Sequence, residues 1–347
     1  MDEVGRITGI WRYPVKSMAG QRVTTAEVGK LGLHADRTWA VRDLEKNATT
    51  SAKRLPGLLL CTARYALPPP PEAGPGHAPE VLIGFPDGSE ISSFDPGVHA
   101  ALSSYLDKDV ELRPLPPIED RDQYRGTMAN PADLHQYFGL DEDEPLPDLS
   151  MFPVKKLAEL SRYITPVGSY ADAYPVHVVT EQTLRRMAAL APGSDFDVRR
   201  FRPTILVDAT TTSTTSTTSG QPETDWCAGT LHAPRAALKP LLPTVRCVMP
   251  SHRQYELRRD RQITRTLVAH AHHCLGVYAT VARNGQLREG DPLGFVPSDR
   301  SLIAATAGAG AVRVKRLLMK AGATAISRGA KRRQHQPRSG EQAVENS

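Results

Sequence analysis

The stretch Val4-Gly5-Arg6-Ile7-Thr8-Gly9-Ile10-Trp11-Arg12-Tyr13-Pro14-Val15-Lys16-Ser17 opens the chain and carries the pattern on which the fold assignment depends. Residues 4–12 alternate roughly between apolar and polar side chains, as a half-buried strand does. Lys16 and Ser17 follow this strand, and they offer a point charge, a hydroxyl and a backbone N–H. The sequence therefore predicts a strand that ends in groups able to bind an anion.

Two later segments have the same residue types. In Asp36-Arg37-Thr38-Trp39, the guanidinium of Arg37 can hold a phosphate in a two-pronged fashion. Arg199-Arg200-Phe201-Arg202-Pro203-Thr204 leads into another predicted strand. Basic residues at strand ends are usually solvated, so each segment alone is also compatible with an ordinary surface, and spacing does not show whether the three converge.

Composition favours a mainly β protein with some α-helix. The 347 residues include 29 prolines and only 6% aromatics, a mixture typical of short strands and turns. Strands are expected at 4–12, 22–28, 38–43, 80–83 and 90–92, with a surface loop at 67–76, a turn at Pro86-Asp87-Gly88 and a helix at 99–106. Such close punctuation predicts a β-barrel or a sandwich.

The second half repeats this pattern around one clear strand–helix unit. A buried strand at 175–179 precedes Thr180, a natural N-cap, and a helix over 181–187. Further strands are expected at 202–208, at 229–232 and around Cys247, and a hairpin at 277–287 with Asn284-Gly285 as its turn. Residues 113–150 are rich in Pro, Asp and Glu and are interpreted as a linker, and 210–220 as a Thr/Ser insertion without a core.

The net charge of +5 is concentrated in the last part of the chain. Residues 301–347 hold nine Lys/Arg and two Asp/Glu, which leaves 34 basic and 36 acidic groups, a net charge of −2, in the first 300. A near-neutral body does not predict a broad phosphate-binding face. Nucleic acid is therefore not an expected partner, except through the basic tail.

Neither a membrane span nor an export signal is expected, because the chain has no apolar run of roughly 18 residues and no basic start followed by an apolar stretch. The expected location is the cytoplasm, where the four cysteines would be reduced thiols. Their spacing fits neither a zinc site nor a plant-type iron–sulfur centre. The cysteines are Cys61, Cys227, Cys247 and Cys274.

Among the four cysteines, Cys247 is the one best suited to a chemical role. Its neighbour Arg246 favours the thiolate, which is the form that attacks or binds metal. A small buried core residue is the competing interpretation for an isolated cysteine. The run His270-Ala271-His272-His273-Cys274 suggests a metal site only superficially, since adjacent histidines point in different directions on a regular element.

Five motifs, taken in order, resemble the family of MOSC proteins with an N-terminal β-barrel domain. Arg12-Tyr13-Pro14-Val15-Lys16-Ser17 resembles the opening Tyr-Pro-Val-Lys-Ser signature, and residues 32–39 resemble Gly-Leu-x-x-Asp-Arg-x-Trp. Phe201-Arg202-Pro203-Thr204 is similar to Phe-Arg-Pro-Asn, and Arg246-Cys247 to the Arg-Cys that supplies the family's metal ligand. Residues 275–278 with 290–292 resemble the closing Phe-Gly-Val-Tyr and Gly-Asp pair.

The resemblance implies an N-terminal β-barrel domain at 1–112, a linker or insertion at 113–164, a MOSC β-barrel domain at 165–298 and a basic tail at 299–347, with a cofactor cleft between the barrels. It implies a molybdenum–pterin cofactor whose metal is bound by Cys247. The residues implied in binding the rest of the cofactor are Lys16, Ser17, Arg37, Thr180, Thr183, Arg202, Thr204 and Arg246.

The resemblance further implies an oxidoreductase that reduces N-hydroxylated or related N-oxygenated small molecules. Since the chain has no cysteines for a cluster domain of its own, electrons would come from a separate ferredoxin- or flavoprotein-type donor. The alternative is a sulfur-carrier or sulfur-transfer protein that uses a Cys247 persulfide and binds pyridoxal phosphate. The third hypothesis is a non-catalytic binding module that acts through the basic tail. The chain departs from the family at Thr204, where Asn is usual, and at Val248-Met249-Pro250-Ser251, where Thr-Thr-Val-Asp is usual.

Overall fold

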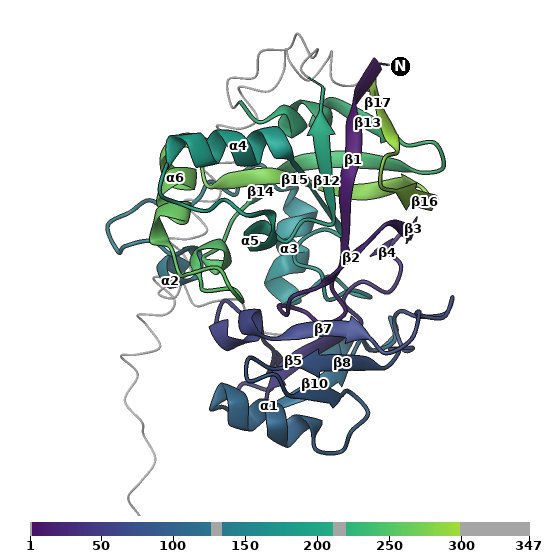
Figure 1. The fold of residues 1–347 in the computed structure, drawn as a ribbon, viewed down its shortest axis with the longest axis vertical. Coiled ribbons are helices and arrows are strands. Elements are labelled where there is room, and N and C mark those ends of the chain that lie inside the picture. Colours follow the sequence, from purple (N-terminus) through teal and green to yellow (C-terminus); the bar gives the residue numbers. More distant parts are fainter. Residues whose placement is uncertain (1, 126–133, 211–219, 299–347) are drawn as a thin grey trace, which may run out of the picture. The chain divides into compact units, whose positions relative to one another are not determined.

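The computed structural model describes residues 2–125, 134–210 and 220–298, so the basic tail and most of the Thr/Ser insertion lie outside the described residues. Its main feature is a barrel of seven strands, in the order β12-β11-β15-β14-β13-β17-β1, which closes because β1 also pairs with β12 (Figure 1). The strands are β1 (Asp2–Arg12), β11 (Val176–Thr180), β12 (Ile205–Ala209), β13 (Gly229–His232), β14 (Ala237–Val245), β15 (Cys274–Arg283) and β17 (Pro292–Pro297).

Strand β1 joins the first residues of the chain to this barrel. It pairs antiparallel with β12, where Ile7 faces Val207, and with β17, where Glu3 faces Gly294. The strand predicted at 4–12 is thus present, and it lies in the sheet made mostly by residues 176–297. The apolar interior of the barrel includes Ile7, Ile10 and Val277, all of which are buried.

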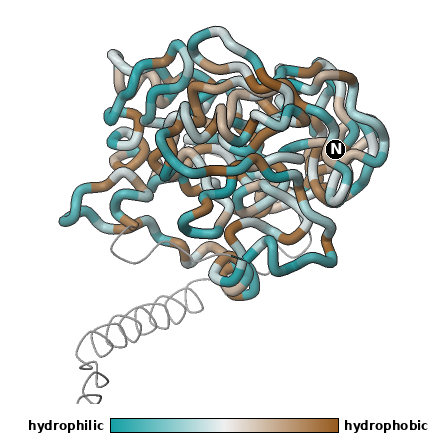
Figure 2. The backbone as a smooth tube through the Cα atoms, turned by 90° about the horizontal axis from the view of Figure 1, so that it is seen from below, coloured by the Kyte–Doolittle hydropathy of each residue, from teal (hydrophilic) through white to brown (hydrophobic). Residues whose placement is uncertain are grey.

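Two three-stranded sheets enclose a second core formed by residues 15–112. One contains β5 (Trp39–Asp43), β6 (Ala48–Thr49) and β10 (Val110–Pro114), and the other contains β7 (Thr62–Tyr65), β8 (Val81–Gly84) and β9 (Glu90–Ser92). The helices α1 (Val98–Leu106) and η1 (Pro56–Leu60) pack on this core. In Figure 2, short hydrophobic and hydrophilic stretches alternate along the chain, as they do in short strands with one buried face. The predicted mainly β fold is confirmed.

The strand predicted at 22–28 is two strands, β2 (Gln21–Val23) and β3 (Thr25–Gly29), which belong to different sheets. The sheet of β3 also contains β4 (Gly32–Leu33) and β16 (Gly285–Arg288). The predicted hairpin at 277–287 was therefore wrong. Both edges of β15 are occupied, by β11 and β14, so β16 pairs with β3 instead. The turn needs Gly285, because a Cβ there would lie 1.9 Å from the carbonyl oxygen of Arg235.

Helices cover the barrel and fill the predicted linker. Thr180 is the N-cap of α4, as predicted, and its hydroxyl accepts from the Thr183 amide at 3.2 Å.

The predicted linker at 113–164 contains the helices η2, α2 and α3. No described helix is long and apolar enough to cross a membrane. The helices are η2 (Arg121–Tyr124), α2 (Leu134–Phe138), α3 (Val154–Arg162), α4 (Glu181–Leu190), α5 (Val198–Phe201), η4 (Pro222–Ala228), η5 (Met249–Ser251) and α6 (Arg261–Ala271).

Candidate functional site

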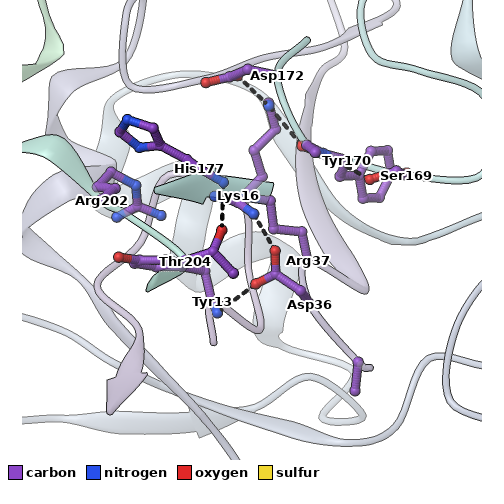
Figure 3. A network of polar contacts seen from close by, with 12 residues as sticks. Tyr13, Lys16, Asp36, Arg37, Ser169, Tyr170, Asp172, His177, Arg202 and Thr204 are labelled. Atoms are coloured by element: carbon purple, nitrogen blue, oxygen red, sulfur yellow. Dashed lines mark hydrogen bonds and ion pairs between the residues drawn. The ribbon is translucent and has the colours of Figure 1, made fainter. Parts of the chain in front are cut away.

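The three segments that the sequence predicts to bind an anion converge in the structure. We call their basic side chains, together with two more, the cation group: Lys16, Arg37, Lys53, Arg202 and Arg246. Lys16 lies in the turn after β1, Arg37 lies just before β5, and Lys53 follows β6. Arg202 directly follows α5, and Arg246 directly follows β14. The carboxylates that act on these side chains are those of Asp36 and Asp172. Positive charge therefore exceeds negative charge at this site. Figure 3 shows three of the cations, Lys16, Arg37 and Arg202, with Asp36 and Asp172.

The backbone at this site takes unusual conformations. Ser17, Arg37 and Arg202 have φ angles of 75°, 54° and 50°, a left-handed region that residues other than glycine seldom adopt. Arg202 ends α5 and precedes β12, which begins at Ile205 and not at residue 202 as predicted. Such conformations persist only where surrounding contacts hold them, and they cluster at functional sites.

Two guanidinium groups lie over the ring of Tyr13. The ring centroid is 4.2 Å from Arg202 Cζ and 5.0 Å from Arg37 Cζ, and the phenol donates to the carbonyl of Pro203 at 2.9 Å. Arg37 also pairs with Asp36, whose other oxygen accepts from the Tyr13 amide at 2.8 Å. Burial raises the pKa of Tyr13. The phenol is therefore neutral, and its ring is in cation–π contact with both guanidiniums.

Lys16 is 6% exposed, and its Nζ donates to the Tyr170 carbonyl at 2.8 Å and to Asp172 Oδ1 at 2.9 Å. Burial lowers the pKa of Lys16, while the adjacent Asp172 raises it. Burial by itself would raise the pKa of Asp172, but Lys16 and Lys53 hold it well below its usual range. Asp172 therefore remains ionised and partly neutralises the group.

Lys53, Tyr137 and Asp172 are site residues that the sequence analysis missed. Lys53 Nζ pairs with the hydroxyl of Tyr137, lies 4.4 Å from the centroid of its ring and is 3.9 Å from Asp172 Oδ1. Burial alone would lower the pKa of Lys53, but Asp172, Tyr137 and Cys247 raise it well above its ordinary value. No motif marks these residues, because α2 brings Tyr137 to Lys53 across 84 positions of sequence.

Cys247 is half-buried. The sequence predicted a strand around it, but β14 ends at Val245, two residues before Cys247. It packs against the core of residues 15–112, and the amide of the next residue, Val248, donates to the Tyr137 carbonyl at 3.0 Å. Arg246 donates from Nη2 to the Phe201 carbonyl at 2.9 Å. The structure thus brings Cys247 beside Lys53, which gives the thiol a cation other than its sequence neighbour.

Several donors of the site are buried without a protein acceptor. Among the described residues these include Nε of Arg12, Nη2 of Arg202 and Nε of Arg246. Such groups carry a desolvation cost unless an acceptor reaches them. A small anionic molecule supplies such acceptors. In contrast, the described part of the chain has no group of three His, Cys, Asp or Glu side chains placed to hold a metal ion. A metal at Cys247 would have to arrive with ligands of its own.

A cavity of about 100 Å³ opens beside the cation group. Its lining residues are Trp11, Tyr13, Ala19, Gly20, Leu59, Arg199, Arg202, Gln254, Tyr255 and Leu257. Ligand pockets are commonly a few hundred Å³, so this cavity fits part of a cofactor and not the whole of it.

The hydroxyl groups of the other predicted cofactor-binding residues make hydrogen bonds within the protein. Thr180 and Thr183 are fully buried, and both hydroxyls donate to Glu223 Oε2, at 2.6 and 2.7 Å. The anion at the start of α4 is thus a carboxylate of the chain itself. The hydroxyl of Ser17 accepts from the Ala52 amide at 3.0 Å, and that of Thr204 accepts from the His177 amide at 3.1 Å.

The histidines near residue 272 do not form a metal cluster with Cys274. Cys274 is buried, its thiol donates to the His272 carbonyl at 3.4 Å, and burial raises its pKa to about 12. His177, which lies in the site, has a pKa lowered to about 3 by burial and by the Arg246 charge, and is therefore neutral.

Comparison with known proteins agrees with this architecture. Residues 4–90 match the family described as the MOSC N-terminal beta barrel domain, and residues 166–294 match the MOSC domain. Connector residues 91–165, including Tyr137, lie outside both matches. No curated protein matches the chain.

Two solved structures are similar over parts of the chain. The crystal structure of the YuaD protein from Bacillus subtilis is 11% identical, with a TM-score of 0.37, over 84% of this chain and 94% of that one. A hypothetical protein is 13% identical, with a TM-score of 0.27, over 36% of this chain and 53% of that one. The two family matches together cover more than half of the sequence, and the chain belongs to the MOSC family with an N-terminal MOSC β-barrel domain.

Proposed function

We propose that this chain binds a molybdenum–pterin cofactor and acts as an oxidoreductase. MOSC domains are associated with binding the molybdenum cofactor or with sulfur transfer. The observation that carries the proposal is the placement of Cys247 beside a buried group of cations that retain unused hydrogen-bond donors. An anionic molecule that carries its own metal satisfies both features, because thiolate is a suitable ligand for a soft metal.

The residues of the chain have separable tasks in this proposal. Lys16, Arg37 and Arg202 would hold the anionic end of the cofactor, and the ring of Tyr13 contacts both guanidiniums. Lys53 places a positive charge near Cys247, whose sulfur would bind the metal. The bound cofactor supplies the two-electron redox change. Asp172 limits the excess positive charge, so the buried lysines keep their protons.

The proposed substrates are N-hydroxylated or related N-oxygenated small molecules, reduced with electrons from a separate ferredoxin- or flavoprotein-type donor. The four cysteines are free, and Cys61 and Cys274 are buried in cores. They cannot hold an iron–sulfur cluster together, which supports an external donor. Free thiols also fit the reducing cytoplasm, the proposed location.

Metal and pterin analysis tests the proposal. The protein is purified from a molybdenum-replete host, and metal is measured by mass spectrometry and pterin by fluorescence after oxidation. We expect near-stoichiometric molybdenum in the wild type and in Cys227→Ala, a matched half-buried control, and loss of the metal in Cys247→Ala. A wild-type protein that lacks metal and takes up none from a cofactor donor would refute the proposal.

Sulfur transfer is the second candidate, since Lys53 and Arg246 beside Cys247 would also stabilise a persulfide anion. The cation group would then hold the phosphate of pyridoxal phosphate. The chain is incubated with a cysteine desulfurase and cysteine, and Cys247 is examined by peptide mass spectrometry. A mass increase of one sulfur on Cys247 alone supports this candidate, and an unmodified thiol contradicts it.

A further inference from the structure

A loop of exposed arginines follows Cys247, and neither the fold nor the proposed cofactor site accounts for it. We call residues 252–260 the arginine loop; it runs from the end of η5 to Asp260, the N-cap of α6. Arg253, Arg258 and Arg259 are exposed, and their side chains have no ion-pair partner within the described ranges. The loop therefore presents three arginines without an ion-pair partner among the described residues, beside the carboxylates of Glu256 and Asp260.

A buried arginine holds this loop in one conformation. Arg200 is 2% exposed, and its guanidinium donates to the carbonyls of Pro250 at 3.0 Å, His252 at 3.3 Å and Arg258 at 2.8 Å. Gln254 and Leu257 exchange two backbone hydrogen bonds, at 3.0 and 2.7 Å. These contacts fix the backbone on both sides of the tip, so the outward side chains are preorganised.

The tip itself carries a strained aromatic residue. Tyr255 has φ of 46°, a left-handed conformation that bulky residues rarely adopt, and its side chain is 51% exposed. Strain held in place by surrounding contacts is typical of functional segments. Tyrosine and arginine are also the residues enriched among the energetic centres of protein interfaces.

The arginine loop lies next to the candidate site. Gln254, Tyr255 and Leu257 form one side of the 100 Å³ cavity whose other side includes Tyr13 and Arg202. A partner seated on the loop would therefore contact the rim of the cation group. Such proximity is what transfer of electrons between two proteins requires.

We propose that the arginine loop docks an acidic protein surface, of the kind that a small acidic electron carrier presents. The inference rests on the proposed function, because that function requires an external electron donor. Nucleic acid is less suited, since Glu256 and Asp260 interrupt the arginines and the first 300 residues carry a net charge of −2. Electrostatic complementarity mainly accelerates encounter and selects the partner.

Binding of a plant-type [2Fe–2S] ferredoxin, an acidic probe, to the full chain tests the proposal. Affinity is measured by calorimetry at about 20 and about 150 mM ionic strength, where screening differs strongly. We expect the variant Arg258→Glu/Arg259→Glu to bind at least about tenfold more weakly at low salt. Tyr255→Ala, which leaves the net charge unchanged, should also weaken binding.

The control variant Lys30→Glu/Lys239→Glu makes the same change in net charge at exposed positions on other elements. Equal affinity of the control and the arginine-loop variant would overturn the proposal. Tighter binding of a short duplex DNA than of ferredoxin, lost in the arginine-loop variant, would also overturn it. Binding is measured without turnover, so its result is separate from the molybdenum content that decides the proposed function.

Discussion

The guanidinium of Arg202 lies 4.2 Å from the ring centroid of Tyr13, although 189 positions separate the two residues in sequence. Arg37 approaches the same ring at 5.0 Å. The ring attracts both cations through its π electrons. Asp36 pairs with Arg37, while Nη2 of Arg202 has no protein acceptor among the described residues and is available for an anion.

Replacing Tyr13 should weaken retention of the anionic cofactor. Tyr13→Leu removes the ring that both guanidiniums contact, and each lost cation–π contact is worth about 0.5–2 kcal/mol. We expect roughly tenfold weaker binding, measured as pterin retained after extended dialysis. Tyr13→Phe keeps the ring and loses only the bond to the Pro203 carbonyl, so it should retain pterin nearly as well as wild type. Equal loss in both variants would contradict the role of the ring.

Lys53 should control the reactivity of the Cys247 thiol. Lys53→Met removes the ammonium beside the sulfur, and we expect the rate of Cys247 alkylation by iodoacetamide at neutral pH to fall by about tenfold. The rate is measured by peptide mass spectrometry, which separates Cys247 from Cys227. Lys156→Met, on α3, serves as the control. An unchanged rate would show that Lys53 does not act on this thiol.

Arg200 should be essential for stability. Arg200→Lys leaves several buried carbonyls without their donors, because one ammonium cannot span Asp195, Pro250 and Arg258. We expect a loss of about 2–4 kcal/mol in the free energy of unfolding, measured by urea denaturation. Arg199→Lys is the matched change at the half-exposed neighbour and should cost less than about 1 kcal/mol. If Arg200→Lys lost no more unfolding free energy than Arg199→Lys, the arginine loop would keep its conformation without the Arg200 guanidinium.

Glu223 should make stability depend on pH. Burial raises its pKa, while the hydroxyls of Thr180 and Thr183 partly oppose this. Because the pKa of Glu223 is higher in the folded than in the unfolded state, its protonated form contributes to the stability of the fold. This stabilisation is fully present below the unfolded-state pKa and is lost as pH rises through the folded-state pKa. Glu223→Gln cannot ionise, so its Tm should fall less than that of wild type between acidic and neutral pH. Parallel Tm profiles for the two proteins would contradict this assignment.

Local patterns in the sequence determined the elements that depend on near neighbours. The strand over residues 4–12, the turn at Pro86-Asp87-Gly88 between β8 and β9, and the N-cap Thr180 all follow from residues within a few positions of each other. The motifs also identified the family and named four members of the cation group, Lys16, Arg37, Arg202 and Arg246. Their side-chain chemistry alone suggested an anion site.

Tertiary structure alone decided which charges meet and what neutralises them. The bond from Lys16 to Asp172 spans 156 positions, and Lys53 reaches Tyr137 through a connector helix that no motif marks. Likewise, β16 pairs with β3 because both edges of β15 are already occupied. Sequence patterns report the periodicity and capping of one segment. Barrel closure, burial and electrostatic coupling depend on contacts between distant segments, and these set the charge of the site and the surroundings of Cys247.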